Sequence, residues 1–319
     1  MPAPVKLAGR TAVITGAASG IGRALAQRLS RQGSPVVIAD VFEAGLKETA
    51  DSLTGPVLTR ILDVSDAGDV TRFAAEVAAW LPARGPERGR LGAVFNNAGV
   101  AVGASVLDSV PADDQWLWDI NFHGVVNGTR AFLPLLVEQD SGAMVNTSSV
   151  FGLAGIPGQS AYCASKFAVR GFTDSLRQEV RGTGVRAVTV HPGGIKTNIA
   201  RSARISSDPL GLGRSPADVV KEFEAILMTS PEKAAQVIQH GVEQGKGRIL
   251  IGPDAHVFDV LTRITPTHYW DIMEPVEARM RALRNKREAL RAGRAARAGR
   301  AGDAARGQAA ARGQAGEAK

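Results

Sequence analysis

The fold of this chain is set by the segment Thr11-Ala12-Val13-Ile14-Thr15-Gly16-Ala17-Ala18-Ser19-Gly20-Ile21-Gly22. Its first four residues form an apolar run typical of a buried strand, and helical spacing of apolar residues follows from Arg23 to Leu29. Glycines between a strand and a helix permit a tight turn, let backbone N–H groups approach a pyrophosphate, and allow the helix to pack closely on the sheet. The positive end of the helix would face the phosphates. The segment therefore predicts a dinucleotide site at Gly16, Ser19, Gly20, Ile21 and Gly22, with a tight turn that binds nothing as the alternative.

A second apolar run, from Pro35 to Ala39, ends in Asp40, which lies 24 positions after Gly16. A dinucleotide fold places an acidic residue there to accept hydrogen bonds from the adenosine ribose hydroxyls. The same carboxylate would repel a 2′-phosphate, and neither Val41 nor Ser19 offers a basic partner to one. The sequence therefore favours NAD over NADP as the cofactor. A solvated acid at a strand end is the alternative for Asp40.

Further apolar runs alternate with helix-like segments along the chain. They lie at residues 58–64, 93–96, 143–147, 186–191 and 248–251. This alternation predicts an α/β fold with one Rossmann domain, in which a doubly wound parallel sheet of about seven strands is flanked by helices. We expect this domain to span residues 5–264 and to bind its ligands beyond the carboxyl ends of the strands.

Distinctive motifs stand at those strand ends and in one helix-like segment. They are Asp63-Val64, Asn96-Asn97-Ala98-Gly99, Ser148-Ser149, Tyr162-Cys163-Ala164-Ser165-Lys166, and Pro192-Gly193-Gly194-Ile195-Lys196-Thr197. With these motifs in this order, residues of about 7 to 255 resemble the short-chain dehydrogenase/reductase family. The subgroup is the one with a TGxxxGIG turn, NNAG, a serine thirteen positions before a tyrosine, and YxxxK.

Tyr162 and Lys166 lie four positions apart in a segment without proline or glycine, so they share one helix face. An ammonium close to a phenol favours the phenolate, and we expect it to pull the tyrosine pKa down from about 10. The pair therefore predicts a general acid/base. The alternative is an amphipathic helix with a packed tyrosine and a solvated lysine.

Two further polar side chains complete the candidate catalytic set. Ser149 could donate a hydrogen bond to a substrate oxygen and stabilise the charge that builds there. Ser148 competes for this role, and the spacing of the family selects Ser149. Asn121 matches the proton-relay asparagine of the family, and a structural bridge is its alternative.

The resemblance implies additional cofactor contacts and a quaternary structure. Asp63 and Val64 would lie near adenine, Lys166 would bind the nicotinamide ribose, and Tyr162 would also contact the cofactor. The remaining implied cofactor contacts are Asn97, Ala98 and Gly99 on the adenosine side, and Pro192, Gly193, Ile195 and Thr197 near the nicotinamide. The helices that carry Asn121 and Tyr162 would pair across subunits, which implies a homodimer or homotetramer.

Residues 198–229 match the mobile substrate lid of the family. Apolar residues of this segment and of the stretch after Ser149 predict a fairly apolar secondary alcohol or ketone as substrate, and ordinary lid packing is the alternative. These residues are Val219, Val220, Phe223, Ile226 and Leu227, and Val150, Phe151, Leu153, Ile156 and Pro157. A substrate with an acidic group is a further alternative, because the lid also carries Arg201, Arg204 and Arg214.

Composition narrows the class of protein. The chain has 319 residues of which 44% are apolar, enough for a sizeable core. It has no run of eighteen apolar residues and no apolar export segment at its start, which predicts a soluble, cytoplasmic protein. Cys163 is the only cysteine, so no intrachain disulfide can form. The five histidines lack metal-ligand spacing, so no metal is predicted, and we expect each of them at the surface or as a cap.

The C-terminal part differs from the rest. Residues 281–319 contain eleven Lys or Arg and three Asp or Glu. We expect a helical extension at 265–290, basic from Pro275 to Leu290, and a disordered tail rich in Ala, Gly and Arg at 291–319. A solvated extension is favoured over contact with nucleic acid or an anionic membrane, because the tail lacks aromatic residues for base stacking.

Together these features predict an NAD-dependent oxidoreductase that interconverts a secondary alcohol and a ketone, with Tyr162 as the general acid/base. A dinucleotide-binding sensor or scaffold without turnover is the alternative, because a fold does not fix a function.

Overall fold

The computed structural model describes residues 5–81, 90–208, 213–276, 278–279 and 282. The chain divides into two compact units, Met1–Ile264 and Thr265–Lys319. In the second unit, residues 269–276 are helical. The predicted tail at 291–319, and most of the predicted basic helix from Pro275 to Leu290, lie outside the described residues.

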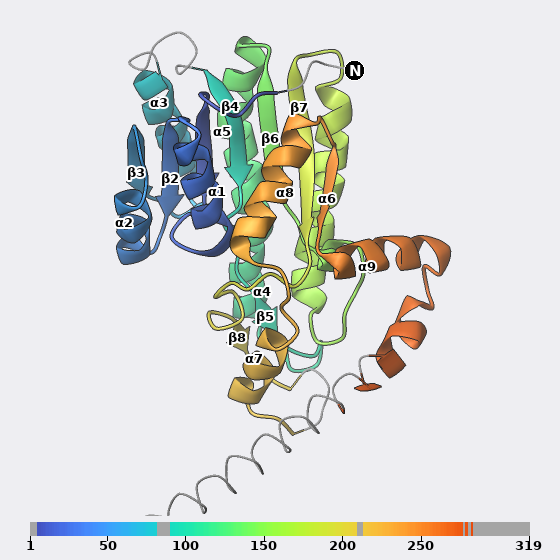
Figure 1. Ribbon diagram of the computed structural model, residues 1–319. Coiled ribbons are helices and arrows are strands. Elements are labelled where there is room, and N and C mark those ends of the chain that lie inside the picture. Colours follow the sequence, from blue (N-terminus) through green and yellow to red (C-terminus); the bar gives the residue numbers. More distant parts are fainter. Residues whose placement is uncertain (1–4, 82–89, 209–212, 277, 280–281, 283–319) are drawn as a thin grey trace, which may run out of the picture. The chain divides into compact units, whose positions relative to one another are not determined.

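The first unit is built on a seven-stranded sheet in which all neighbouring strands are parallel, as predicted (Figure 1). The strand order is β3-β2-β1-β4-β6-β7-β9. The bounds are β1 (Thr11–Thr15), β2 (Val36–Asp40), β3 (Val57–Ile61), β4 (Leu91–Asn96), β6 (Gly142–Thr147), β7 (Val185–Pro192) and β9 (Arg248–Ile251).

Strand β3 is shorter than the apolar run that predicted it. It ends at Ile61 rather than at Val64. The chain turns at Asp63, whose carboxylate accepts hydrogen bonds from the backbone N–H and the hydroxyl of Ser65. Asp63 and Val64 therefore lie in the loop that follows β3.

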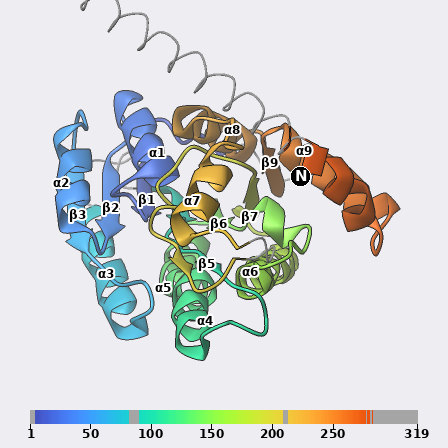
Figure 2. The same ribbon diagram turned by 90° about the horizontal axis from the view of Figure 1, so that it is seen from below.

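Helices cover both faces of the sheet (Figure 2). One face carries α1, α2 and α8, and the other carries α3, α5 and α6. The helix bounds are α1 (Gly20–Arg31), α2 (Glu43–Asp51), α3 (Ala67–Trp80), α4 (Pro111–Trp118), α5 (Gly124–Glu138), α6 (Ser160–Glu179), α7 (Pro216–Glu224), α8 (Pro231–Glu243) and α9 (Pro253–Ile264), with a π-helix η2 (Asp119–His123) and a 3-10 helix η3 (Val150–Gly152).

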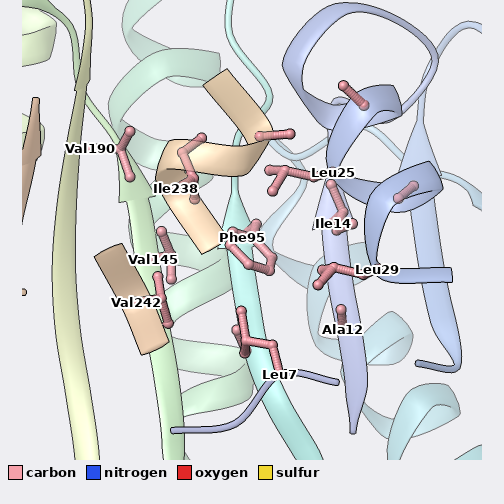
Figure 3. Packing of buried hydrophobic residues seen from close by; sticks show 14 of the residues in the cluster. Leu7, Ala12, Ile14, Leu25, Leu29, Phe95, Val145, Val190, Ile238 and Val242 are labelled. Atoms are coloured by element: carbon pink, nitrogen blue, oxygen red, sulfur yellow. The ribbon is translucent and has the colours of Figure 1, made fainter. Parts of the chain in front are cut away.

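The hydrophobic core consists of two layers, one on each side of the sheet. Ala12 and Ile14 of β1 pack in the layer with α1 and α8, whereas Val13 packs in the layer with α3 and α5 (Figure 3). Because successive strand residues point to opposite faces and both faces are covered, β1 must be apolar throughout. This explains the continuous apolar runs of the sequence.

A second sheet joins two segments beyond the main one. Strands β5 (Val102–Gly103) and β8 (Arg204–Ile205) pair in parallel, so the predicted lid is attached to the loop that follows β4. The Arg204 guanidinium lies 3.7 Å from the centre of the Trp116 ring, and it forms an ion pair with Asp113. Strands of two residues carry no recognisable pattern, and the sequence did not predict them. Among the described residues, no helix has the length and apolar character needed to cross a bilayer.

Candidate active site

The glycine turn brings three predicted segments together. Gly16 and Gly20 have φ angles of +66° and +53°, in the left-handed region that favours glycine. A Cβ on Gly16 would lie 2.7 Å from the Ala98 Cα, and one on Gly20 would lie 2.9 Å from Thr197 Cγ2. The turn after β1, the motif after β4 and the motif after β7 are thus in close contact at the carboxyl ends of their strands.

Asn97 braces this turn from the side. Its Nδ2 donates to the carbonyl oxygens of Thr15 and Gly16, at 3.2 and 3.3 Å. The backbone N–H groups of Asn97 and Ala98 both donate to Thr15 Oγ1. The side chain of Asn97, a predicted cofactor contact, thus stabilises the conformation of the glycine turn.

The start of α1 is open to a ligand. Ser19 is the N-cap residue in an extended conformation, and its side chain makes no capping hydrogen bond. The first turn of α1 contains no acidic residue. The partial positive charge of the helix start is therefore not neutralised by a side chain of its own turn, as a phosphate site requires.

Asp40 lies beside the same turn. Its Oδ2 accepts a hydrogen bond of 2.9 Å from the Ala18 N–H, and its Oδ1 accepts one of 3.0 Å from the Phe42 N–H. The guanidinium of Arg23 is bound to backbone carbonyls and to Glu48. The negative group next to the turn is thus fixed in place, and Arg23 is held by protein partners.

Tyr162, Lys166 and Ser149 are brought together below the end of β6. All three are buried, with exposures of 9%, 3% and 8%. The Tyr162 hydroxyl is hydrogen-bonded to the Ser149 side chain. Lys166 Nζ lies 5.6 Å from the centre of the Tyr162 ring and donates to the Thr147 carbonyl at 3.2 Å. The two residues predicted to share a helix face therefore share one site.

The pKa of Tyr162 differs from our expectation. Burial raises it to about 12, and the hydrogen bond with Ser149 opposes this rise. Burial also lowers the pKa of Lys166 to about 8. The expected lowering of the tyrosine pKa is absent because the ammonium is directed at a backbone carbonyl and desolvation of the phenolate dominates. In this state Tyr162 is an acid that holds its proton at neutral pH.

The two competing serines occupy different environments. The Ser148 hydroxyl donates to the Lys166 carbonyl at 2.7 Å, and its N–H donates to the Val190 carbonyl. Ser148 therefore joins α6 to the sheet, whereas Ser149 faces Tyr162.

Asn121 lies in the π-helix η2, fully buried. Its amide bonds both polar groups of the Val100 backbone, at 2.8 and 3.0 Å. A Cβ on Gly99 would lie 3.1 Å from Asn121 Oδ1 and 3.3 Å from Lys166 Nζ, so these two groups flank the same glycine. The structural bridge is present, and it places the amide next to the lysine.

The remaining predicted cofactor contacts differ in burial and in their neighbours. Val64 packs against Gly124 at the start of α5, and Asp63 is exposed. Pro192 and Ile195 are buried, Gly193 and Thr197 are half-buried, and Ile195 forms a bridge with Thr229.

Asp254, at the start of α9, is a site residue that the sequence did not reveal. Its Oδ2 accepts a hydrogen bond of 2.7 Å from the Gly194 N–H, and a Cβ on Gly193 would lie 2.1 Å from both carboxylate oxygens. An aspartate in the first turn of a helix is a common cap, so nothing in the sequence singled out Asp254. Its contact with Gly193 and Gly194 is visible only in the structure.

The prediction that every histidine lies at the surface or caps a helix is wrong for His191. This residue is fully buried near the end of β7. Its Nδ1 lies 3.0 Å from the Ser149 carbonyl oxygen. Its place within an apolar run was the signal for burial. Within the described ranges, no group of three or more His, Cys, Asp or Glu residues is arranged to hold a metal ion.

Replacing Gly22 with alanine is expected to destabilise the domain. The added Cβ would lie 2.2 Å from the Gly16 carbonyl oxygen, so the backbone of the turn must shift, at a cost of about 1–3 kcal/mol. Gly171 of α6 has no neighbouring atom within 4 Å of an added Cβ, and its replacement by alanine should stabilise by about 0.5–1 kcal/mol. Urea unfolding of both variants measures this, and equal shifts in the same direction would contradict the tight turn.

The parallel sheet, its covering helices and the glycine turn after β1 define the class of fold, a Rossmann fold. A model of the short chain dehydrogenase family matches residues 10–208. The chain is 43% identical over 267 residues to the oxidoreductase SadH of Mycobacterium tuberculosis strain H37Rv. The match covers 82% of this chain and 92% of SadH. It is 31% identical over 243 residues to the 3-oxoacyl-(acyl-carrier-protein) reductase FabG of Thermotoga maritima, covering 73% of this chain and 95% of FabG.

A solved structure agrees with these relatives. The crystal structure of a short-chain dehydrogenase/reductase from Burkholderia phymatum in complex with NAD has a TM-score of 0.72 and 31% sequence identity, covering 81% of this chain and 94% of that one. This chain belongs to the short-chain dehydrogenase family.

Proposed function

We propose that this protein is an NAD-dependent oxidoreductase that interconverts a secondary alcohol and a ketone on a fairly apolar substrate. The observation that carries the proposal is the buried group of Tyr162, Ser149 and Lys166, in which the phenol and the serine hydroxyl are already hydrogen-bonded to each other. Both groups can hydrogen-bond to one oxygen atom of a substrate, which is where charge changes during reduction of a carbonyl.

The glycine turn fits a dinucleotide. The uncapped start of α1 would bind the pyrophosphate through the backbone N–H groups of Ser19, Gly20 and Ile21, because the first N–H groups of a helix have no partner within the helix. Asp40 would accept hydrogen bonds from the hydroxyls of the adenosine ribose, and Ile195 and Thr197 would contact the nicotinamide end. When bound, the nicotinamide supplies a carbon that gives or accepts a hydride.

The residues of the chain supply the proton and hold the substrate oxygen. In reduction of a ketone, Tyr162 donates its proton to the oxygen, and Ser149 donates a hydrogen bond to the same atom. In oxidation of an alcohol, Tyr162 accepts the proton. To stabilise the phenolate in that direction by its positive charge, the Lys166 ammonium would turn from the Thr147 carbonyl toward Tyr162. Asn121 lies beside it to hold a water for proton exchange.

Apolar side chains next to Tyr162 support an apolar substrate. Phe151 packs edge-on against the Tyr162 ring, with centroids 5.9 Å apart. Tyr162 forms a hydrophobic cluster with Val102 and Leu117. The half-buried residues packed against this cluster include Val100, Trp116, Trp118 and Ile199. A ketone with a hydrocarbon or aromatic substituent would gain contact area here.

A spectrophotometric panel tests the proposal. Secondary alcohols of increasing apolar size are supplied with NAD or with NADP, and reduced cofactor is recorded by its absorbance. Turnover with NAD that rises with apolar size supports the proposal. Tight NAD binding without turnover on any alcohol or ketone favours the alternative, a dinucleotide sensor or scaffold.

Replacing Asp40 with alanine is expected to weaken discrimination against NADP. The substitution removes the ribose acceptor and the like charge that repels a 2′-phosphate. The ratio of kcat/KM for NAD to that for NADP should fall about tenfold or more, because one hydrogen bond to a charged group is lost. An unchanged ratio would exclude Asp40 as the discriminating residue. Asp51, an exposed acid at the end of α2, is the control position for the same change.

We further propose that the protein acts as a homodimer or homotetramer that assembles through the helices carrying Asn121 and Tyr162. Size-exclusion chromatography with light scattering measures the oligomeric state. We also propose that the protein acts in the cytoplasm. Contact of the C-terminal tail with an anionic surface stays an alternative function, and turnover that survives removal of residues 292–319 would argue against it.

A further inference from the structure

His191 connects the end of β7 to the candidate catalytic serine. Its ring is buried in the sheet, and its Nδ1 lies 3.0 Å from the carbonyl oxygen of Ser149. A carbonyl oxygen can only accept a hydrogen bond, so Nδ1 must carry the proton and donate. Burial, together with the nearby charges of Arg248 and Arg170, lowers the pKa of His191 to about 4. The ring is therefore neutral at physiological pH, with Nδ1 as its N–H.

The backbone cannot make this connection. The N–H of Ser148 donates to the Val190 carbonyl at 2.8 Å, which continues the ladder between β6 and β7. The next N–H of β7 in this parallel ladder would be that of position 192, which would face the carbonyl of Ser148 rather than that of Ser149, and Pro192 has no N–H. The imidazole of His191 therefore gives the Ser149 carbonyl a donor that the β7 backbone does not provide.

The bond holds the residue whose hydroxyl meets Tyr162. Ser149 is extended, with φ −164° and ψ 168°, and its Oγ accepts from the Phe151 N–H at 3.1 Å while it pairs with Tyr162. Its carbonyl is attached to the same Cα as the side chain. If the carbonyl lost its donor, the peptide would rotate toward another partner, and the hydroxyl would move with it.

We propose that His191 is a positioning residue for Ser149. Its Nδ1–H holds the Ser149 carbonyl, so that the Ser149 hydroxyl can hydrogen-bond to the same substrate oxygen that receives the proton of Tyr162. This inference rests on the proposed oxidoreductase function. His191 touches neither substrate nor cofactor, and it acts through the Ser149 carbonyl.

Two substitutions separate positioning from packing. His191→Leu fills the buried space without a donor, whereas His191→Asn retains an N–H donor at the position of Nδ1. With the alcohol that gives turnover, His191→Leu should lower kcat by about 10-fold to 100-fold, with KM and the Kd for NAD changed less than about twofold. His191→Asn should recover at least about a third of the lost kcat. His240→Leu, at an exposed histidine of α8, is the matched control and should keep the wild-type kcat.

A double-mutant cycle shows whether the effect passes through the serine. In a Ser149→Ala background, His191→Leu should cause no further loss of kcat, because the hydroxyl to be positioned is gone. An equal loss in both backgrounds, or wild-type kcat in His191→Leu, would overturn the proposal. Loss of kcat in His191→Asn as large as in His191→Leu would overturn it as well.

A spectroscopic measurement is independent of turnover. Histidine ring nitrogens of the ¹⁵N-labelled full-length protein at pH 7 should show His191 as the neutral Nδ1–H form, and a proton on Nε2 would overturn the proposal. If the wild-type protein turns over no alcohol or ketone but His191 shows this form, the oxidoreductase proposal has failed while the hydrogen bond stands. If the wild-type protein is active and His191→Leu is as active, the positioning role alone has failed.

Discussion

Tyr162→Phe is expected to lower kcat by about 10²–10⁴-fold, while the Kd for NAD changes less than about threefold. The substitution removes one oxygen atom and leaves the ring in place against Phe151 and Lys166. The proton that must reach the substrate oxygen then has no donor, and Ser149 loses its hydrogen-bond partner. Under the proposed function the loss falls mainly on kcat, because the phenol would transfer its proton to the reacting oxygen.

The matched control is the second tyrosine of the chain. Tyr269→Phe makes the same chemical change in the second unit of the chain, at a tyrosine that belongs to none of the site motifs, and should retain the wild-type kcat. Steady-state kinetics with the alcohol from the panel, and NAD titration by fluorescence, give both quantities. A Tyr162→Phe variant with more than about a third of the wild-type kcat would show that another group transfers the proton.

The sequence predicted the fold well because each local pattern agreed with the others. Apolar runs such as Val36 to Ala39 are buried on both faces, so their strands could be read from composition alone. The glycines could be placed in the turn because only glycine fits there, as the 2.2 Å approach at Gly22 illustrates. Features that depend on distant contacts were missed. The β5–β8 pair is two residues long, and the role of Asp254 depends on Gly193 and Gly194, about sixty positions earlier.

The electrostatics of the site could not be predicted from spacing. A spacing of four residues in a helix places Tyr162 and Lys166 on one face. The direction of the Lys166 ammonium, however, depends on the end of β6, where the Thr147 carbonyl accepts a hydrogen bond from it. Burial then outweighs the attraction between the two charges and moves both pKa values away from the ionised forms. His191 shows the same limit, because its contact with the Ser149 carbonyl depends on how β7 lies beside the end of β6.

Lys166→Met is expected to stabilise the free protein while it abolishes turnover. Burial lowers the pKa of Lys166 from 10.5 to about 8, so at pH 7 the folded protein holds an ammonium that desolvation disfavours. A difference of this size corresponds to about 3 kcal/mol, because each pKa unit is about 1.4 kcal/mol. The variant also leaves the Thr147 carbonyl without its donor, which costs about 1 kcal/mol. The net gain in the free energy of unfolding should be about 1–3 kcal/mol.

The pH dependence gives this prediction its sign. A lysine whose folded pKa is lower than its unfolded pKa costs stability at low pH, because the unfolded chain binds the proton more readily. The contribution of Lys166 to the free energy of unfolding should therefore rise as the pH increases from about 8 to 10.5, and Lys166→Met should remove it. Burial raises the pKa of Cys163 above 9.0 and acts in the opposite direction in this range, and the pKa of Tyr162, raised to about 12, acts above about pH 10. Both groups are present in both proteins, so the difference between the wild type and Lys166→Met isolates the lysine.

Urea unfolding at pH 7, 8.5 and 10 measures the effect, with Lys246→Met as the control at an exposed lysine. The control should be neutral within about 0.5 kcal/mol at each pH. If Lys166→Met were less stable than the wild type at pH 7, the ammonium would have to be stabilised by its surroundings, and the desolvation of Lys166 would be refuted. The expected gain implies that the site keeps a charge that weakens the fold, and under the proposed function this charge would serve the proton chemistry of Tyr162.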